Sequence, residues 1–185
     1  MTYCVNDIDQ SFVIDFQDQT QHTKSVSRFM NKRRFPVSHC IFIAADCPLP
    51  EVTPSQEYPL EINLDTGTVS DGGADDNYFL FAFDEVDIYS EKKYGVHLEL
   101  YQFTDGRAGQ IIAYIRTALT QTDSVEIWNV WLSGYWEFED RPYICKKTVP
   151  IDELTADDIK EIVQAENWDN RDHNRPWFYC LEIIR

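Results

Sequence analysis

Residues 125–132 read VEIWNVWL, and this stretch decides the fold. Alternate positions fall into two sets, and both contain large apolar side chains: Val125, Ile127 and Asn129 in one, Glu126, Trp128 and Val130 in the other. An extended segment points alternate side chains to opposite faces, so both faces of this one are apolar. A strand of that kind is typical of the centre of a covered sheet. We therefore expect residues 125–132 to form a central strand.

The segment before this strand shows a helical period. Apolar side chains recur at helical spacing over residues 108–119: Ala108, Ile111, Ile112, Ile115 and Leu119. Thr104 or Asp105 is placed to cap the helix that this spacing predicts. Ahead of it, residues 96–103 (VHLELYQF) alternate and predict a strand, with Val96 and Leu98 on one face.

Other segments complete the expected fold. Further strands are expected at residues 11–16, 38–44, 60–64, 78–83, 143–149 and 177–184. Thr155 and Asp158 have the spacing of a capping box and begin a short helix that ends near residue 164. Irregular or turn-rich chain is expected at 45–59, 65–77 and 133–142, and a short helix or a loop at 25–30. The pattern predicts a single α+β domain over residues 1–185, with a mixed, largely antiparallel sheet and two or three helices packed on one side.

The charge distribution is uneven. The chain of 185 residues has a net charge of −16, and residues 37–91 contain twelve Asp and Glu residues and no Lys or Arg. Such a field repels nucleic acid and anionic membranes and attracts basic surfaces. We expect a protein partner with a basic surface and no direct binding to nucleic acid or membrane. A solvated face that only aids solubility is the alternative.

Cysteine usage and the N-terminal residues indicate the compartment. The five cysteines are an odd number, and the first residues, MTYCVND, lack the basic and apolar regions of a secretory signal. No apolar run approaches the roughly 18–20 residues of a membrane span. We therefore expect a cytoplasmic protein with free thiols. Cys40 and Cys180 lie in apolar runs and are expected in the core.

The sequence contains none of the motifs that we associate with catalysis. Residues 104–109 have glycines before a predicted helix but lack the other residues of a phosphate-binding loop. No GxSxG is present, and the apolar neighbours of Cys180 argue against a reactive thiolate. His39 and Cys40 would point to opposite faces of a strand and would not share a zinc ion. We predict a non-enzymatic protein without cofactor or metal; a metal on the oxygen-rich loop 65–77 is the alternative.

Aromatic and acidic residues gather between positions 128 and 140. Trp128 and Trp131 are expected in the core, on opposite faces of their strand. The residues that follow fall in a predicted turn, where exposed rings supply contact area and carboxylates complement a basic partner. Together with the acidic middle segment, they give the predicted partner-binding set: Asp71, Asp75, Asp76, Asp84, Glu85, Asp87, Tyr135, Trp136, Glu137, Glu139 and Asp140.

Four stretches in the last third of the chain carry a family resemblance. They are EIWNVW (126–131), EFEDRP (137–142), ELT (153–155) and NRPWFYCL (174–181). These stretches resemble the immunity proteins that bacteria encode beside polymorphic toxins. The resemblance implies a cytoplasmic protein that binds the toxic domain of a cognate effector and occludes its active site. Many such toxins are nucleases with basic clefts, which an acidic inhibitor reaches quickly.

Two other functions are compatible with the sequence. An acidic nucleic-acid mimic, of the anti-restriction or anti-CRISPR type, would place carboxylates at phosphate-like spacing. The aromatic richness and the irregular spacing of the acids argue against it. An uncharacterised enzyme or metal-binding domain is the third possibility.

Overall fold

The computed structural model describes residues 38–132, 143–165 and 177–185. The chain divides into two compact units, 1–34 and 35–185, and all described residues belong to the second. The strand expected at 11–16 and the helix or loop expected at 25–30 lie outside the described residues. A single domain over residues 1–185 therefore stays a prediction.

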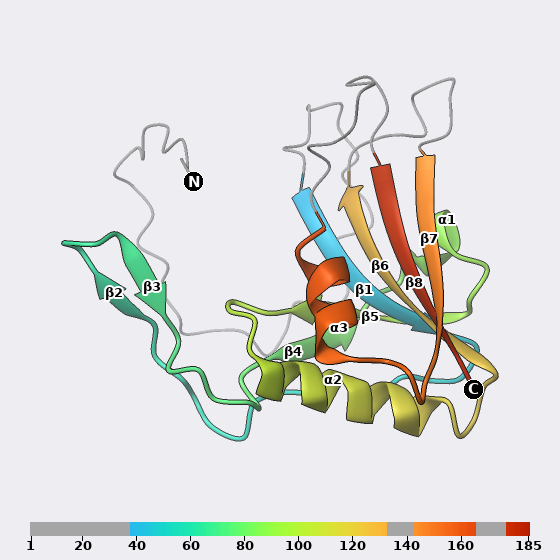
Figure 1. Ribbon diagram of the computed structural model, residues 1–185, viewed down its shortest axis with the longest axis horizontal. Coiled ribbons are helices and arrows are strands. Elements are labelled where there is room, and N and C mark those ends of the chain that lie inside the picture. The colour runs from blue at the N-terminus through green and yellow to red at the C-terminus, as the bar shows by residue number, and fades with distance from the viewer. Residues whose placement is uncertain (1–37, 133–142, 166–176) are drawn as a thin grey trace, which may run out of the picture. The chain divides into compact units, whose positions relative to one another are not determined.

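The centre of the described unit is a six-stranded sheet (Figure 1). Its strands, in spatial order, are β4 (Phe79–Ala82), β5 (Tyr94–Glu99), β1 (Ser38–Ala45), β6 (Ser124–Leu132), β8 (Trp177–Ile184) and β7 (Tyr143–Pro150). Neighbouring strands are antiparallel except β7 and β8, which are parallel. Together with the helices described below, this sheet confirms the predicted α+β class with a mixed, largely antiparallel sheet.

Strand β6 occupies the central position that its two-sided pattern predicts. It pairs with β1 on one side and with β8 on the other, so that Ile127 lies opposite both Ile43 and Leu181. Ile127 and Trp128 point to opposite faces, and both are buried. The predicted double burial of this strand is therefore confirmed.

Two helices cover one face of the sheet, α2 (Asp105–Ala118) and α3 (Ala156–Val163). Ile111 and Ile115 of α2 and Ile159 of α3 are fully buried in the core on this face. Thr104 caps α2, because its side chain accepts a hydrogen bond from the Arg107 amide. Both helices and the cap agree with the sequence-based expectations.

The opposite face of the sheet packs against a short third helix, α1 (Val86–Tyr89), which the sequence did not predict. Fully buried Phe42 lies at the centre of this second core, and its ring centroid is 4.6 Å from that of Phe83 and 6.1 Å from that of Trp128. Tyr89 places its ring centroid 5.6 Å from that of Phe42. Aromatic packing thus fixes α1 on the face that α2 and α3 leave uncovered.

A separate hairpin, β2 (Glu61–Asn63) and β3 (Thr68–Ser70), interrupts the acidic middle segment; it is drawn in teal and green at the left of Figure 1. The prediction that residues 65–77 form an exposed loop is wrong in two respects. Residues 68–70 are a strand, and Asp71 and Asn77 are buried. Residues 68–70 form a strand because they pair with β2. Asp71 is buried because its carboxylate forms an ion pair with Arg107.

Other boundaries differ by a few residues. Strand β5 ends at Glu99 rather than at residue 103, since the chain turns there toward α2. Strands β6 and β7 are not neighbours, because β8 lies between them. The segment 133–142, for which a hairpin or a longer excursion was expected, lies outside the described residues. Within the described residues, no helix has the length and apolar character that a membrane crossing requires.

The capping box of α3 gives a first testable prediction. The Thr155 side chain accepts a hydrogen bond from the Asp158 amide, and the Asp158 carboxylate accepts one from the Thr155 amide at 2.9 Å. Thr155→Ala should lower the free energy of unfolding by about 1 kcal/mol, because amide donors of the first turn lose an acceptor. Urea denaturation measures the loss. Thr155→Ser, which keeps the hydroxyl, should stay close to wild type, and an equal loss in both variants would contradict the capping role.

Candidate protein-binding site

Three of the predicted contact residues lie together at the start of α1. Asp84, Glu85 and Asp87 are all exposed, and Glu85 occupies the N-cap position of this helix without a side-chain hydrogen bond to it. Among the described residues, no ion pair involves any of the three carboxylates. They concentrate negative charge that no ion pair within the described part of the chain neutralises.

Apolar side chains adjoin these carboxylates. Phe81 is 39% exposed at the end of edge strand β4, and Ile88 is 37% exposed on α1. Phe81 lies opposite His97 in the sheet register, as Phe42 does, so it shares the face that α1 covers. Its ring centroid is 5.4 Å from that of Phe79. We call Asp84, Glu85 and Asp87, with Phe81 and Ile88, the acidic corner.

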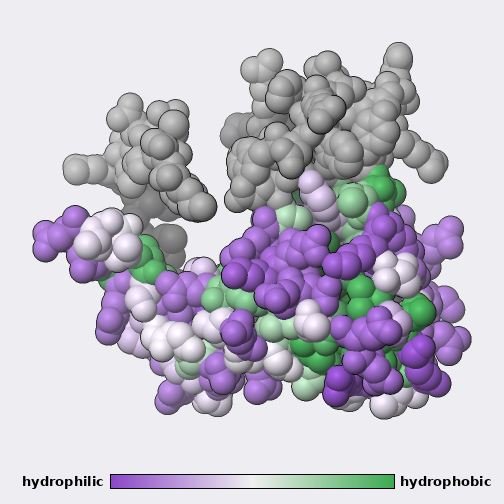
Figure 2. Space-filling model, viewed as in Figure 1, coloured by the Kyte–Doolittle hydropathy of each residue, from purple (hydrophilic) through white to green (hydrophobic). Residues whose placement is uncertain are grey.

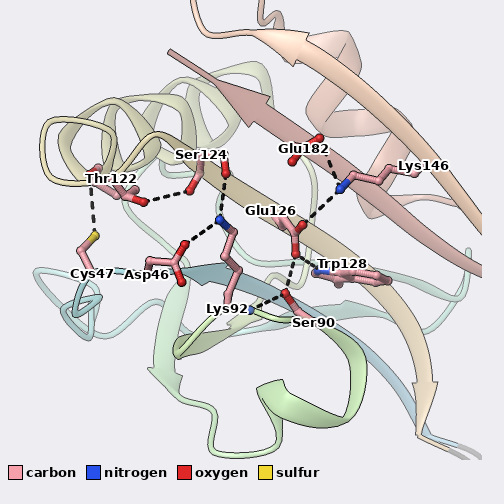
Figure 3. A network of polar contacts seen from close by, with 11 residues as sticks. Asp46, Cys47, Ser90, Lys92, Thr122, Ser124, Glu126, Trp128, Lys146 and Glu182 are labelled. Carbon is pink, nitrogen blue, oxygen red and sulfur yellow. Dashed lines mark hydrogen bonds and ion pairs between the residues drawn. The ribbon is translucent and has the colours of Figure 1, made fainter.

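A buried carboxylate fixes the chain just after α1 (Figure 3). Glu126 of β6 is 7% exposed, and its Oε2 accepts hydrogen bonds from Ser90 Oγ at 2.5 Å and from Trp128 Nε1 at 2.8 Å. Lys146 Nζ of β7 lies 3.3 Å from the other oxygen, Oε1. The donors compensate for burying the charge. Glu126 therefore ties the segment after α1 to two strands of the sheet.

A second polar contact holds the same segment. Lys92 Nζ donates to Asp46 Oδ2 and to Ser124 Oγ, each at 2.8 Å (Figure 3). The Lys92 amide also donates to Ser90 Oγ at 3.1 Å. The acidic corner thus packs on an aromatic core, and the polar contacts of Glu126 and Lys92 hold the segment that follows it. These contacts fix its geometry in the absence of a partner.

Asp71, another predicted contact residue, is buried rather than exposed. Its carboxylate forms a bidentate ion pair with Arg107 in the first turn of α2, with Nη1–Oδ2 and Nη2–Oδ1 distances of 2.7 and 3.0 Å. Arg107 also donates to the carbonyl oxygens of Ala74 and Gln102. Burial raises the pKa of Asp71, but hydrogen bonds from Arg107 and Gly73 outweigh it, so the net pKa is lowered. Asp71 serves the fold and is not part of the acidic corner.

Asp75 and Asp76, the other two predicted contact residues between positions 65 and 77, also lie against other residues of this protein. Asp76 accepts hydrogen bonds from the hydroxyls of Ser55 and Tyr58, which lower its pKa to about 2. Asp75 is exposed, and its carboxylate lies so close to Gly106 that a Cβ atom there would overlap it. Asp71 and Asp75 lie against the first turn of α2, and Asp76 follows Asp75 in the chain. Asp84, Glu85 and Asp87 lie at α1, on the opposite face of the sheet. The structure therefore separates the predicted acids into two groups.

The third group of predicted contacts, Tyr135, Trp136, Glu137, Glu139 and Asp140, lies outside the described residues. Phe81 and Ile88 were not predicted as contacts. The signal for Ile88 is the spacing of Val86 and Tyr89, which places both of those residues on the buried side of one helical turn and leaves Ile88 outside.

The remaining groups that could carry chemistry are possible metal ligands and the cysteine thiols. Within the described ranges, no cluster of three or more His, Cys, Asp or Glu residues could hold a metal ion. Cys40, Cys47 and Cys180 are free and buried, and burial raises the pKa of the Cys40 thiol to about 12. Cys145 is free and exposed beside a cavity of about 510 Å³ between α3 and strands β7 and β8. The four described cysteines are free, and the buried positions of Cys40 and Cys180 agree with the sequence-based expectation.

Comparison of the chain with protein-family models, curated proteins and solved structures gives no match. The resemblance of residues 126–185 to immunity proteins therefore stays a prediction. The acidic corner is therefore proposed as a binding site on its geometry and charge alone.

Proposed function

We propose that this protein binds and neutralises a cognate bacterial toxin domain in the cytoplasm of the cell that makes it. A nuclease with a basic cleft is the class of toxin that the charge of this protein suits. On this proposal it acts by binding and occlusion rather than by catalysis. The observation that carries the proposal is the acidic corner, where exposed carboxylates that form no ion pair with any described residue adjoin exposed apolar side chains. Carboxylates provide complementarity to a basic cleft, and apolar side chains provide the contact that keeps the partner bound.

The fixed geometry of the corner supports the same function. An inhibitor that must act before its target does harm benefits from a surface that is already arranged for binding. Here the aromatic core around Phe42 and the Glu126 and Lys92 contacts hold α1 in place. Charge steering raises the association rate, and rigidity limits the entropy lost on binding.

A co-expression experiment tests the proposed function. The C-terminal domain of the protein encoded just upstream is expressed in cells with and without this protein. We expect growth arrest that this protein relieves, and co-purification of the two chains. A toxic neighbour that this protein neither binds nor counteracts would overturn the proposal and favour the nucleic-acid mimic.

The corner itself is tested by a charge variant. Asp84→Asn, Glu85→Gln and Asp87→Asn together remove three charges with little change in shape. We expect the association rate with the toxin domain to fall by about tenfold or more at low ionic strength, with a smaller change in the dissociation rate. Stopped-flow kinetics over a range of salt concentrations measures this, and the difference from wild type should shrink as salt screens the charges.

A control variant separates local from overall charge. Asp152→Asn, Glu153→Gln and Asp157→Asn remove the same charge from exposed positions near the start of α3. This control should associate nearly as fast as wild type. If both triple variants slow association equally, the acidic corner is not the binding surface.

A further inference from the structure

The β2–β3 hairpin exposes apolar side chains that no other part of the described chain covers. Leu60, Ile62, Leu64 and Val69 are 45%, 64%, 89% and 49% exposed. Ile62 and Val69 are cross-strand partners, and Leu60 alternates with Ile62 along the strand, so these three share one side of the hairpin. Leu64 begins the turn. Figure 2 shows hydrophobic surface on the hairpin at the left of the view. We call these four side chains the hairpin face.

The hairpin is held in place without using this face. Asn63 Oδ1 accepts a hydrogen bond from the Asp65 amide at 3.0 Å, and Gly67 takes the positive φ of 65° that the turn needs. Gln102 Nε2 donates to the carbonyl oxygen of Val69 at 2.5 Å. The buried ion pair of Asp71 and Arg107 fixes the chain where β3 ends. Polar contacts therefore position the hairpin, and none of the described residues buries its apolar side.

The charged residues around the hairpin indicate which charge a molecule that binds the hairpin face would carry. The exposed charged residues on or beside the hairpin are Glu57, Glu61 and Asp65, and no Lys or Arg occurs between residues 37 and 91. A second copy of this chain that docked through the same hairpin would bring like charges together. Four side chains also supply only part of the roughly 800 Å² per partner that a stable dimer buries. A partner with cations around an apolar centre matches both properties of the hairpin.

We propose that the hairpin face docks a cationic amphipathic segment of a partner protein, one in which Lys or Arg alternates with aliphatic residues. The aliphatic side chains pack on Ile62 and Val69, and the cations lie near Glu61 and Asp65. This docking is separate from the acidic corner, and it does not depend on a toxin being the partner.

Synthetic peptides test the proposal directly on the full chain. One peptide alternates Lys with Val, and a second of equal length and charge alternates Lys with Ser. The variants are Ile62→Ser and, as a matched control, Ile144→Ser, because Ile144 of edge strand β7 is a similarly exposed isoleucine at 53%. Titration calorimetry should show the Lys–Val peptide binding about tenfold or more tightly than the Lys–Ser peptide. Ile62→Ser should remove that preference, and Ile144→Ser should keep it.

Every other result overturns the proposal. Equal binding of the two peptides, or no binding, would leave the face without this ligand class. A preference for the Lys–Val peptide that survives in Ile62→Ser would show that this peptide binds elsewhere on the protein. The melting temperature of free Ile62→Ser protein should equal that of wild type. A fall that depends on protein concentration would assign the face to a second copy, and a fall that does not would assign it to another segment of this chain.

Discussion

Replacing Arg107 with Met is expected to lower the free energy of unfolding by about 3–5 kcal/mol, the usual cost of breaking a buried ion pair by removing one partner. The side chains of Arg107 and Asp71 are both 0% exposed. Without the guanidinium, the Asp71 carboxylate stays buried without its cationic partner. The carbonyl oxygens of Ala74 and Gln102 also lose their donors. Urea denaturation at neutral pH measures the effect.

The pH dependence identifies the carboxylate as the cause. In the wild type the pKa of Asp71 is lowered, so the pair stabilises the fold above the ordinary aspartate pKa, about 4, and this contribution is lost as pH falls through the lowered value. In Arg107→Met, burial favours the protonated acid. The gap between variant and wild type should therefore narrow as pH falls toward 4.

Arg116 supplies the control, because it is an exposed arginine in the last turn of the same helix. Arg116→Met should change the free energy of unfolding by less than about 1 kcal/mol. A similarly small effect for Arg107→Met would show that the buried pair does not hold the base of the hairpin.

Replacing Phe42 with Ala should also cost about 3–5 kcal/mol, the range for removing a large core side chain. Phe42 is 0% exposed, and its ring packs against those of Phe83, Tyr89 and Trp128. The substitution would leave a cavity next to α1, because Phe42 packs against Tyr89 of this helix. We therefore expect α1 to open more often than the strands of the sheet do. Hydrogen exchange at the Ser90 amide, which donates to the Val86 carbonyl at 2.8 Å, should speed up relative to amides of β6.

Phe81→Ala is the matched comparison for stability. It removes the same atoms from a ring that is 39% exposed on the same face of the sheet. It should cost markedly less than Phe42→Ala, because less apolar surface returns to water and no closed cavity forms. Equal losses in the two variants would contradict the central role of Phe42.

The strongly periodic segments were predictable from sequence. The two-sided pattern of residues 125–132 predicted the central strand, and the spacing of Ile111 and Ile115 predicted α2. The capping box at Thr155 predicted the start of α3. In each case local pattern and tertiary burial favour the same structure, so a short window of sequence contains enough information.

Long-range pairings were not predictable in this way. Nothing in residues 65–77 indicates that Asp71 meets Arg107, because the two residues are far apart in the chain and charged residues are ordinarily exposed. One signal existed: Arg107 lies four residues before Ile111 and eight before Ile115, on the apolar stripe of α2. A cation at that position needs a buried anion.

The candidate site was predicted only in part. Local acidity identified Asp84, Glu85 and Asp87, which the structure places together at one exposed corner. It also selected Asp71, which is buried in an ion pair, and Asp76, whose carboxylate accepts hydrogen bonds from Ser55 and Tyr58. Composition shows where acids occur in the chain, but not which of them fold inward.

The order of strands has a consequence for the timing of synthesis. Strand β7 pairs only with β8 among the described strands, and β8, the last of them in chain order, also lies beside β6. While the ribosome is still translating β8, β7 has no neighbour among the described strands, and none of these strands covers one edge of β6. Partly made chains would expose these strand edges to chaperones or to aggregation. A complete sheet can therefore form only after the codons up to Ile184 have been read.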